Sequence, residues 1–283
     1  MVVPHPKWCI SKFSGGIFTD VSFLPSFNST VIELYMDRIP GLSEWFLALN
    51  DDFFFGAPVE PSDFFTEDGC VRVHLTDEPC PSGEPLETDP AWVAGLKNAN
   101  VLLNQRFGKE QRFIGTHNVR PMRRSICEAC RQDFAEAYQE ATAHRFRSHS
   151  DIMLPLFLHV HYALSAGEGE LATMDEYFAN GIGPDLGRNE QHFAEIRRRR
   201  PVLFCLNDQG MYKEPEASVQ LQTFLEECFP HTSPFERVCF VDCLRRKICH
   251  PFSRMVNCPE NTSRKESIPL RGLRSGSGES ASS

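Results

Sequence analysis

The sequence lacks several features that would assign it to a specialised class of protein. No apolar stretch approaches the roughly 20 residues that a transmembrane helix needs, so no membrane span is predicted. Residues 1–16 contain no unbroken apolar segment, and a secretory signal peptide is therefore not expected. Positive charge is not in excess either. With a formal net charge of -9, nonspecific binding to nucleic acid is not expected.

A regular cysteine framework is also missing. The 11 cysteines are scattered and odd in number, which argues against a disulfide scaffold. We interpret most of them as reduced, small, buried hydrophobic residues. Structural zinc is a minor alternative, because two groups of ligand-type residues occur without forming two clean Cys-x2-Cys pairs. These groups are Cys127 and Cys130, and Cys239, Cys243, Cys249, His250 and Cys258.

The chain does have enough apolar residues for a proper core. Its 283 residues, 41% of them hydrophobic, predict one large domain or a domain with extensions. We expect an unassigned segment at 1–20, the domain at 21–250, and a tail rich in Ser, Gly and Arg at 251–283. The composition of the tail favours disorder.

Alternating strand and helix patterns predict an α/β fold. Helical periodicity predicts helices at about 29–38, 91–107, 121–143, 151–165 and 217–228, and one that ends in the arginine run 197–200. Strands are predicted at 45–49 and 202–206. Pro121 is expected to open its helix, and Ser150 to cap the next one. The proline-rich stretch 56–90 is predicted to form a long loop or a small hairpin, and 166–190 a polar connector.

Asn50-Asp51-Asp52 is the most informative motif. It lies between the apolar runs 45–49 and 53–55, where two adjacent carboxylates are costly to bury unless a cation pairs with them. At the end of a core strand, the natural partner is a divalent metal carrying a phosphate-bearing ligand. An acidic turn after a strand is the simpler alternative. The run 202–206 ends in the same way, in Asn207-Asp208, which favours one site assembled from two edges of a sheet.

Two further segments suit phosphate chemistry. His117 precedes the helix predicted at 121–143, whose amino terminus attracts phosphate. It would act as a general base or bind phosphate, although a structural loop histidine is the alternative. In the segment 144–151, Arg145 and Arg147 fall on one side of an extended chain and can face one anion. Asp151 would stand at a helix start. A solvated charged connector is the alternative for this segment.

These motifs resemble the conserved regions of the Stealth proteins, which are sugar-1-phosphate transferases of bacterial capsule synthesis. Their animal relatives include the catalytic subunit of the lysosomal-enzyme N-acetylglucosamine-1-phosphotransferase. Residues 24–29 and 39–55 resemble the second region of that family, 116–151 the third, and 204–208 with 229–236 the fourth. The resemblance implies a Rossmann-like mixed sheet flanked by helices. The family's first region and the first half of its second are not found here, so we expect a fold that is incomplete at the amino terminus.

The resemblance also implies roles for particular residues. Asp51, Asp52 and Asp208 would hold Mg2+ or Mn2+ on a diphosphate. His117 and Arg147 would be catalytic together with Asp52. The remaining pocket residues would bind the nucleotide-sugar, namely Asn50, Arg145, Asp151 and Asn207.

The implied reaction transfers a sugar-1-phosphate from a UDP-sugar donor to a hydroxyl of a saccharide acceptor and releases UMP. The alternatives are a metal-dependent glycosyltransferase that releases UDP, and an inactive relative that only binds a ligand or a partner. The expected compartment is the cytoplasm, at the membrane surface if the protein is bacterial, or the Golgi lumen if it is eukaryotic. Peripheral membrane association and homo-oligomerisation are left open.

Overall fold

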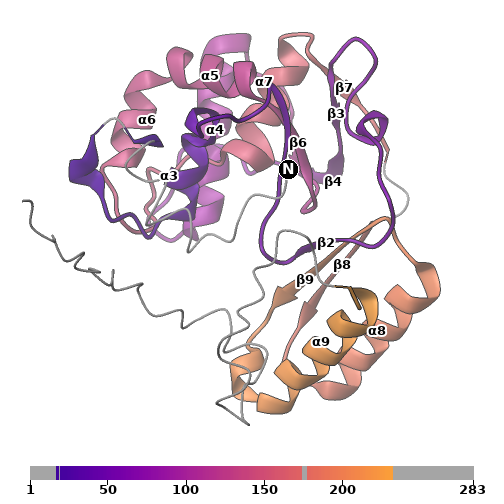
Figure 1. The fold of residues 1–283 in the computed structure, drawn as a ribbon. Helices are drawn as coiled ribbons and strands as arrows, with labels where there is room; N and C mark the ends of the chain where they lie inside the picture. Colours follow the sequence, from indigo (N-terminus) through magenta and orange to yellow (C-terminus); the bar gives the residue numbers. More distant parts are fainter. Residues whose placement is uncertain (1–16, 19, 174–176, 232–283) are drawn as a thin grey trace, which may run out of the picture. The chain divides into compact units, whose positions relative to one another are not determined.

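The computed structural model of the protein describes residues 17–18, 20–173 and 177–231 (Figure 1). Its strands are β1 (Trp45–Ala48), β2 (Phe53–Phe55), β3 (Val71–Val73), β4 (Leu75–Pro79), β5 (Phe113–Gly115), β6 (Arg120–Arg123), β7 (Gly169–Leu171), β8 (Tyr177–Ile182) and β9 (Leu203–Asp208). Its α-helices are α3 (Ser29–Leu34), α4 (Ala91–Phe107), α5 (Arg124–Asp133), α6 (Ala135–Thr142), α7 (His159–Ser165), α8 (Leu186–Arg199) and α9 (Pro215–Cys228). The prediction of an α/β fold is confirmed.

The strands are shared among four small sheets in the described residues. The largest has the order β2-β9-β8, with β2 antiparallel and β8 parallel to β9, and is therefore a mixed sheet. The two-stranded sheets are β1-β6 and β4-β5, both antiparallel, and β3-β7, which is parallel. The turn between β1 and β2 passes from the β1-β6 sheet into the mixed sheet, which places Asn50-Asp51-Asp52 where the two sheets meet.

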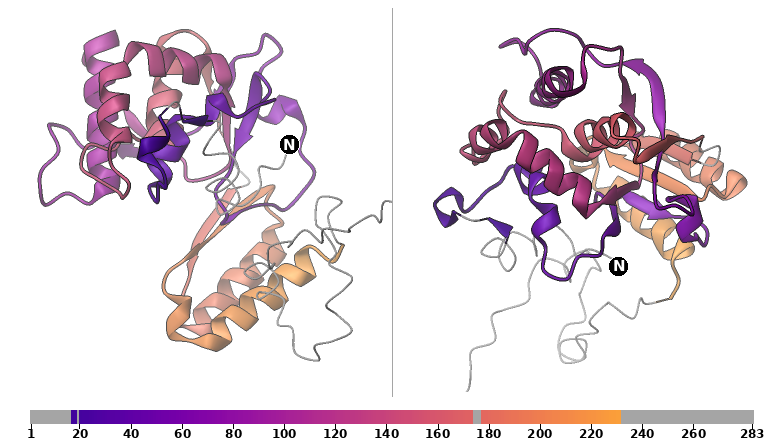
Figure 2. Two further views of the ribbon diagram at one scale, coloured as in Figure 1. Left: turned by 60° about the vertical axis from the view of Figure 1, so that its left-hand side comes forward. Right: turned by 90° about the horizontal axis from the view of Figure 1, so that it is seen from above.

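Alternation along β9 divides its side chains between two apolar clusters. Phe204 and Leu206 join the cluster formed with α8 and α9, which lie beside the mixed sheet (Figures 1 and 2). Leu203 and Cys205 face the other way and pack with Phe53. Because side chains on a strand alternate with a period of two, Asn207 lies on the same face as Cys205.

A larger core lies under α4, α5, α6 and α7. Helix α4 has the predicted bounds, and Trp92 near its start is 46% exposed. Its buried hydrophobic residues lie at helical spacing, namely Ala94, Leu96, Ala99 and Leu103. Cys127 and Cys130 are fully buried free thiols in this core, and burial raises the pKa of both. For these two cysteines the interpretation as buried, reduced residues is confirmed, while residues 239–258 lie outside the described part.

The prediction that Pro121 opens a helix is wrong. Pro121 lies within β6 and pairs in register with Leu47 of β1. Proline has no N–H to donate, but it is tolerated on an edge strand, as every strand of a two-stranded sheet is. The helix begins at Arg124, and it is divided at Phe134 into α5 and α6.

Other predicted boundaries hold in part. The structure confirms two predicted strands and three predicted helices within a few residues. These are the strands at 45–49 and 202–206, the helices at 29–38 and 217–228, and the helix that ends in the arginine run. The segment 154–165 is helical, but it opens with a π-helix, Leu154–Leu158, and Ser150 does not cap it. The stretch 56–90, predicted as a long loop or a small hairpin, has a local antiparallel bridge between Phe65 and Val71. It and the predicted connector 166–190 also contain strands that pair with distant partners, which neither prediction included. Among the described helices, none is long and apolar enough to cross a bilayer.

Candidate functional site

Asp52 is the residue on which three distant segments converge. It directly precedes β2, and its carbonyl oxygen accepts a hydrogen bond from the Leu206 backbone N–H at 3.0 Å, which aligns it with the end of β9. Its Oδ2 accepts hydrogen bonds from Asn207 Nδ2 at 3.1 Å and from the Cys205 thiol at 3.3 Å. Its Oδ1 is buried and has no hydrogen-bond partner in the described structure. The predicted meeting of the two Asn-Asp motifs therefore occurs through side-chain contact.

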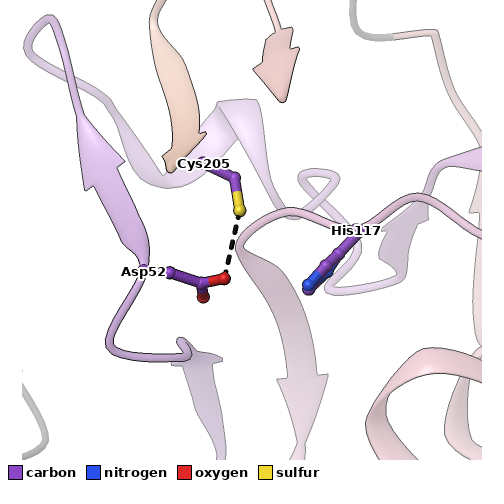
Figure 3. A group of neighbouring side chains, drawn as sticks. All are labelled: Asp52, His117 and Cys205. Atoms are coloured by element: carbon purple, nitrogen blue, oxygen red, sulfur yellow. Dashed lines mark hydrogen bonds between the residues drawn. The ribbon is translucent and has the colours of Figure 1, made fainter. Parts of the chain in front are cut away.

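His117 approaches this carboxylate from the turn between β5 and β6. Its ring makes an edge-to-face contact with Phe53, with ring centroids 4.9 Å apart. One ligand-type atom from each of Asp52, His117 and Cys205 lies within 4.8 Å of the other two. Figure 3 shows the three side chains pointing toward one another, with the hydrogen bond between Cys205 and Asp52 dashed. The Nε2 atom of His117 is buried without a hydrogen-bond partner.

The surroundings of His117 favour its neutral form. Burial is the main cause that lowers its pKa, and the positive charge of Arg120 lowers it further, while the Asp52 carboxylate acts in the opposite direction. A neutral imidazole has one nitrogen that can accept a proton. This electrostatic setting therefore suits a histidine that acts as a general base.

Arg120 is the main cation beside the cluster. It begins β6, where it lies opposite Ala48 of β1, and its side chain is buried. Its guanidinium carbon lies 5.3 Å from the centroid of the Phe53 ring, and its Nη1 donates a hydrogen bond to Asn50 Oδ1 at 3.3 Å. No sequence pattern assigned a role to Arg120. Its position three residues after His117 was the available signal, but the strand that carries it was predicted as the start of a helix.

Glu33 is a second residue that sequence analysis missed. It lies on α3, and burial raises its pKa while the charges of Arg120 and Arg147 act to lower it. Arg147 also donates a hydrogen bond from Nη2 to Ser29 Oγ at 2.9 Å. Glu33 is half-buried. Its carboxylate therefore interacts electrostatically both with Arg147 of the segment 144–151 and with Arg120 beside Asp52.

Asp151 holds the segment 144–151 in place. It is 1% exposed, and its Oδ1 accepts a hydrogen bond from Asn28 Nδ2 at 2.8 Å. Its Oδ2 accepts one from the Ser148 backbone N–H at 3.1 Å. Asn28 is the N-cap of α3, so the same interaction connects this segment to the helix that carries Glu33. Arg145, in the same segment 144–151, donates a hydrogen bond from Nη2 to the Ser22 carbonyl oxygen at 3.1 Å.

The other predicted acidic residues differ in their surroundings. Asp51 is exposed at the tip of the turn between β1 and β2. Asp208 ends β9, and its Oδ1 accepts hydrogen bonds from the backbone N–H groups of Gly210 and Met211 at 2.8 and 2.9 Å. This oxygen therefore stabilises the turn after the strand.

Cys205 was not predicted to take part in the site. Burial and the neighbouring Asp52 carboxylate raise the pKa of its thiol well above the usual range. The alternation of β9 was a signal for it, because a residue two positions before Asn207 shares its face. The apolar run around it instead favoured a core residue, and Cys205 is indeed buried.

Comparison with known proteins places this site within three conserved regions of one family. Family models match conserved region 2 of the Stealth proteins at residues 10–73, conserved region 3 at 116–165 and conserved region 4 at 194–239. Together they cover more than half of the chain, and each contributes a residue to the Asp52 cluster. The chain belongs to the Stealth family. The first of these matches begins inside the segment 1–20 that sequence analysis left unassigned.

Several bacterial proteins that are named as polysaccharide phosphotransferases are similar over most of this chain. An exopolysaccharide phosphotransferase of Streptomyces coelicolor is 34% identical over 245 residues, which cover 82% of this chain and 25% of that protein. A second one from the same organism is 35% identical over 241 residues, 82% of this chain and 44% of that protein. The capsular polysaccharide phosphotransferase of Neisseria meningitidis serogroup A is 31% identical over 222 residues, 76% of this chain and 41% of that protein. This chain thus spans less than half the length of these relatives.

Proposed function

We propose that this Stealth chain transfers a sugar-1-phosphate from a UDP-sugar, such as UDP-N-acetylglucosamine, to a hydroxyl of a saccharide acceptor. In this reaction the acceptor oxygen forms a bond to the sugar-linked phosphorus of the donor. The bond from that phosphorus to the bridging oxygen breaks, and UMP leaves with the oxygen. The phosphotransferase names of the relatives support this class of reaction.

The observation that carries the proposal is the convergence on Asp52. A carboxylate with one unpaired buried oxygen, an imidazole with an unpaired nitrogen and the buried cation Arg120 come together from three parts of the chain. Phosphoryl transfer depends chiefly on positioning and on stabilising charge at the phosphate oxygens. A base for the acceptor hydroxyl and cations for the phosphate are the groups that such a reaction needs.

Asp52 fits the Mg2+ or Mn2+ that the family resemblance implies. Both are hard cations that prefer oxygen ligands, and Asp52 Oδ1 is a carboxylate oxygen that no protein donor occupies. Asp51 and Asp208 would add oxygens from the same turn and from the adjacent strand end. When bound, the ion would neutralise charge on the diphosphate.

Protein groups would carry out the remaining steps. His117 Nε2 would accept the proton of the acceptor hydroxyl, a role that suits its lowered pKa. Arg120 and Arg147 would stabilise the phosphate oxygens, with Arg145 as a further donor. Asn207 holds the Asp52 carboxylate through its hydrogen bond, and Asn50 holds Arg120. Asp151 would contribute by keeping the arginine segment in position rather than by touching the substrate.

The product nucleotide tests this proposal. The purified chain is incubated with UDP-N-acetylglucosamine, a saccharide acceptor and Mg2+, and the released nucleotides are separated by chromatography. We expect UMP as the product. His117→Gln should lower its release by about 100-fold or more, within the usual range for a lost base, and Asp52→Asn should lower it by a similar factor because the ion loses its carboxylate ligand. Glu216→Gln, on the exposed first turn of α9 away from these contacts, serves as the matched control.

The alternative functions predict different results. Release of UDP in place of UMP would identify a glycosyltransferase and contradict the proposed bond cleavage. Donor binding without any nucleotide release, unchanged by Asp52→Asn, would identify a binding protein. UMP release at the same rate in the wild type and in both site variants would show that the chemistry occurs elsewhere.

A further inference from the structure

The cluster around Asp52 offers three different kinds of metal ligand. Asp52 contributes a carboxylate, His117 an imidazole nitrogen and Cys205 a thiol, with one ligand atom of each within 4.8 Å of the others. In the same two residues, Asp52 Oδ1 and His117 Nε2 are buried without hydrogen-bond partners in the described structure. Buried polar atoms normally have partners, so two orphaned atoms on residues of one cluster indicate a missing ligand.

The donor set distinguishes which ion would fit. Mg2+ prefers oxygen ligands in octahedral geometry and keeps several waters. Sulfur with imidazole nitrogen instead favours zinc and similar borderline ions. Zinc bonds of about 2.0–2.3 Å place neighbouring tetrahedral ligands roughly 3.3–3.8 Å apart. Cys205 Sγ and Asp52 Oδ2 are already 3.3 Å apart, and the 4.8 Å limit for the whole set leaves only small side-chain movements to be made.

We propose that Asp52, His117 and Cys205 form an open three-ligand site for zinc, with the fourth position left to water or to a substrate oxygen. Zinc sites with three protein ligands characteristically keep such an open position. Asn207 would orient the carboxylate from the second shell of the metal through its hydrogen bond to Oδ2. Arg120 lies nearby, but its guanidinium is held by Asn50 and by the face of Phe53.

Binding changes the protonation of one ligand. The Cys205 S–H bond breaks, its proton goes to solvent and a sulfur–zinc bond forms, because a coordinating thiol is deprotonated outright. The hydrogen bond from the thiol to Asp52 is lost in the same step, and the Asp52 carboxylate then binds zinc while Oδ2 keeps its hydrogen bond from Asn207. Zinc then has two anionic ligands and one neutral ligand, which balance its charge.

A consequence for catalysis follows, and it rests on the proposed function. Zinc in this site would occupy the Asp52 carboxylate that the diphosphate-bound Mg2+ is proposed to use. We therefore expect zinc to inhibit UMP release, and Cys205→Ala to weaken that inhibition, measured for each protein as the ratio of release with and without zinc. Zinc binding itself is measured without any substrate, so failure of the proposed function leaves the metal site testable.

The test uses the full chain with Co2+ as a spectroscopic substitute for zinc, followed by displacement with Zn2+. We expect a thiolate-to-cobalt charge-transfer band and the intense visible bands of a tetrahedral ion, both removed by Zn2+ and unaffected by Mg2+. Because the chain has other cysteines outside the described residues, the readout is the difference between variants. Cys205→Ala and His117→Ala should each bind one ion fewer than the wild type at micromolar metal.

Controls separate ligation from general effects on folding. Cys228→Ala removes a half-buried free thiol outside the cluster and should leave the ion count unchanged. Cys205→Ser, which keeps the size and a hydrogen bond to Asp52, replaces the alanine variant if that variant does not fold. Asn207→Ala should weaken binding about 10- to 100-fold. Equal ion counts and spectra for the wild type, Cys205→Ser and His117→Ala would overturn the site.

Discussion

His159 should make the stability of this protein depend on pH in a way that can be calculated. The side chain is fully buried at the start of α7, and its Nε2 accepts a hydrogen bond from the Arg123 backbone N–H at 3.0 Å. Burial lowers its pKa from 6.5 to about 3. Protonation would place an N–H opposite the Arg123 N–H and would charge a ring whose Nδ1 has no partner in the described structure.

The sign of the effect follows from where the proton binds. In the unfolded chain, His159 binds a proton below its ordinary pKa of 6.5. In the folded chain, it stays neutral until the pH falls to about 3. Stability from this residue is therefore complete above pH 6.5 and is lost as the pH falls between those values. Between about pH 7.5 and pH 5, linkage gives a loss of about 2 kcal/mol in the free energy of unfolding.

Urea unfolding at the two pH values, followed by circular dichroism, measures this loss. Carboxylates and other histidines also titrate, so the comparison is with His159→Gln, whose amide oxygen can still accept from Arg123 N–H. The variant should be less stable at both pH values, but its loss between them should be smaller than that of the wild type by about 2 kcal/mol. Equal losses of unfolding free energy in the two proteins would refute the assignment of a buried, neutral His159 that accepts a hydrogen bond from Arg123 in β6.

Three further predictions concern the segments that position the site. Asp151→Ala should destabilise the fold by about 3 kcal/mol, measured by urea unfolding, because it leaves Asn28 and a backbone N–H without a charged acceptor. It should also lower UMP release, because the arginine segment 144–151 would be displaced. Gly56→Ala should cost more than about 2 kcal/mol, because its added Cβ would lie 2.3 Å from a backbone oxygen, whereas Gly187→Ala, with only a side-chain oxygen at 3.4 Å, should change thermal stability little. Asn207→Ala should reduce kcat for UMP release by roughly 10-fold. It should lower the melting temperature by no more than a few degrees, since Asn207 is exposed. An unchanged kcat would argue against its role in orienting the Asp52 carboxylate.

Local patterns were enough to predict much of the secondary structure. Helix α4 has no internal Pro and a consistent apolar spacing, and it was placed with the bounds that it has. Helices α8 and α9 and strands β1 and β9 were also located, because each is bounded by Pro, Gly or a change in periodicity. The strand β6 was missed because Pro121 suits the start of a helix as well as an edge strand. The short strands β3 and β7 were missed because each is stabilised by a partner about 100 residues away in the sequence.

The site, too, was predicted where local patterns carry it and missed where distant contacts do. The Asn50-Asp51-Asp52 and Asn207-Asp208 motifs, the nearby histidine and the arginine segment could be found from the sequence, since carboxylates next to core strands are unusual enough to stand out. Which of these residues meet depends on the tertiary structure. The antiparallel pairing of β2 with β9 set Asp52 against Cys205 and Asn207, and the pairing of β1 with β6 brought Arg120 to Asn50. Strand register depends on contacts between residues far apart in the chain, and no local pattern specifies such contacts.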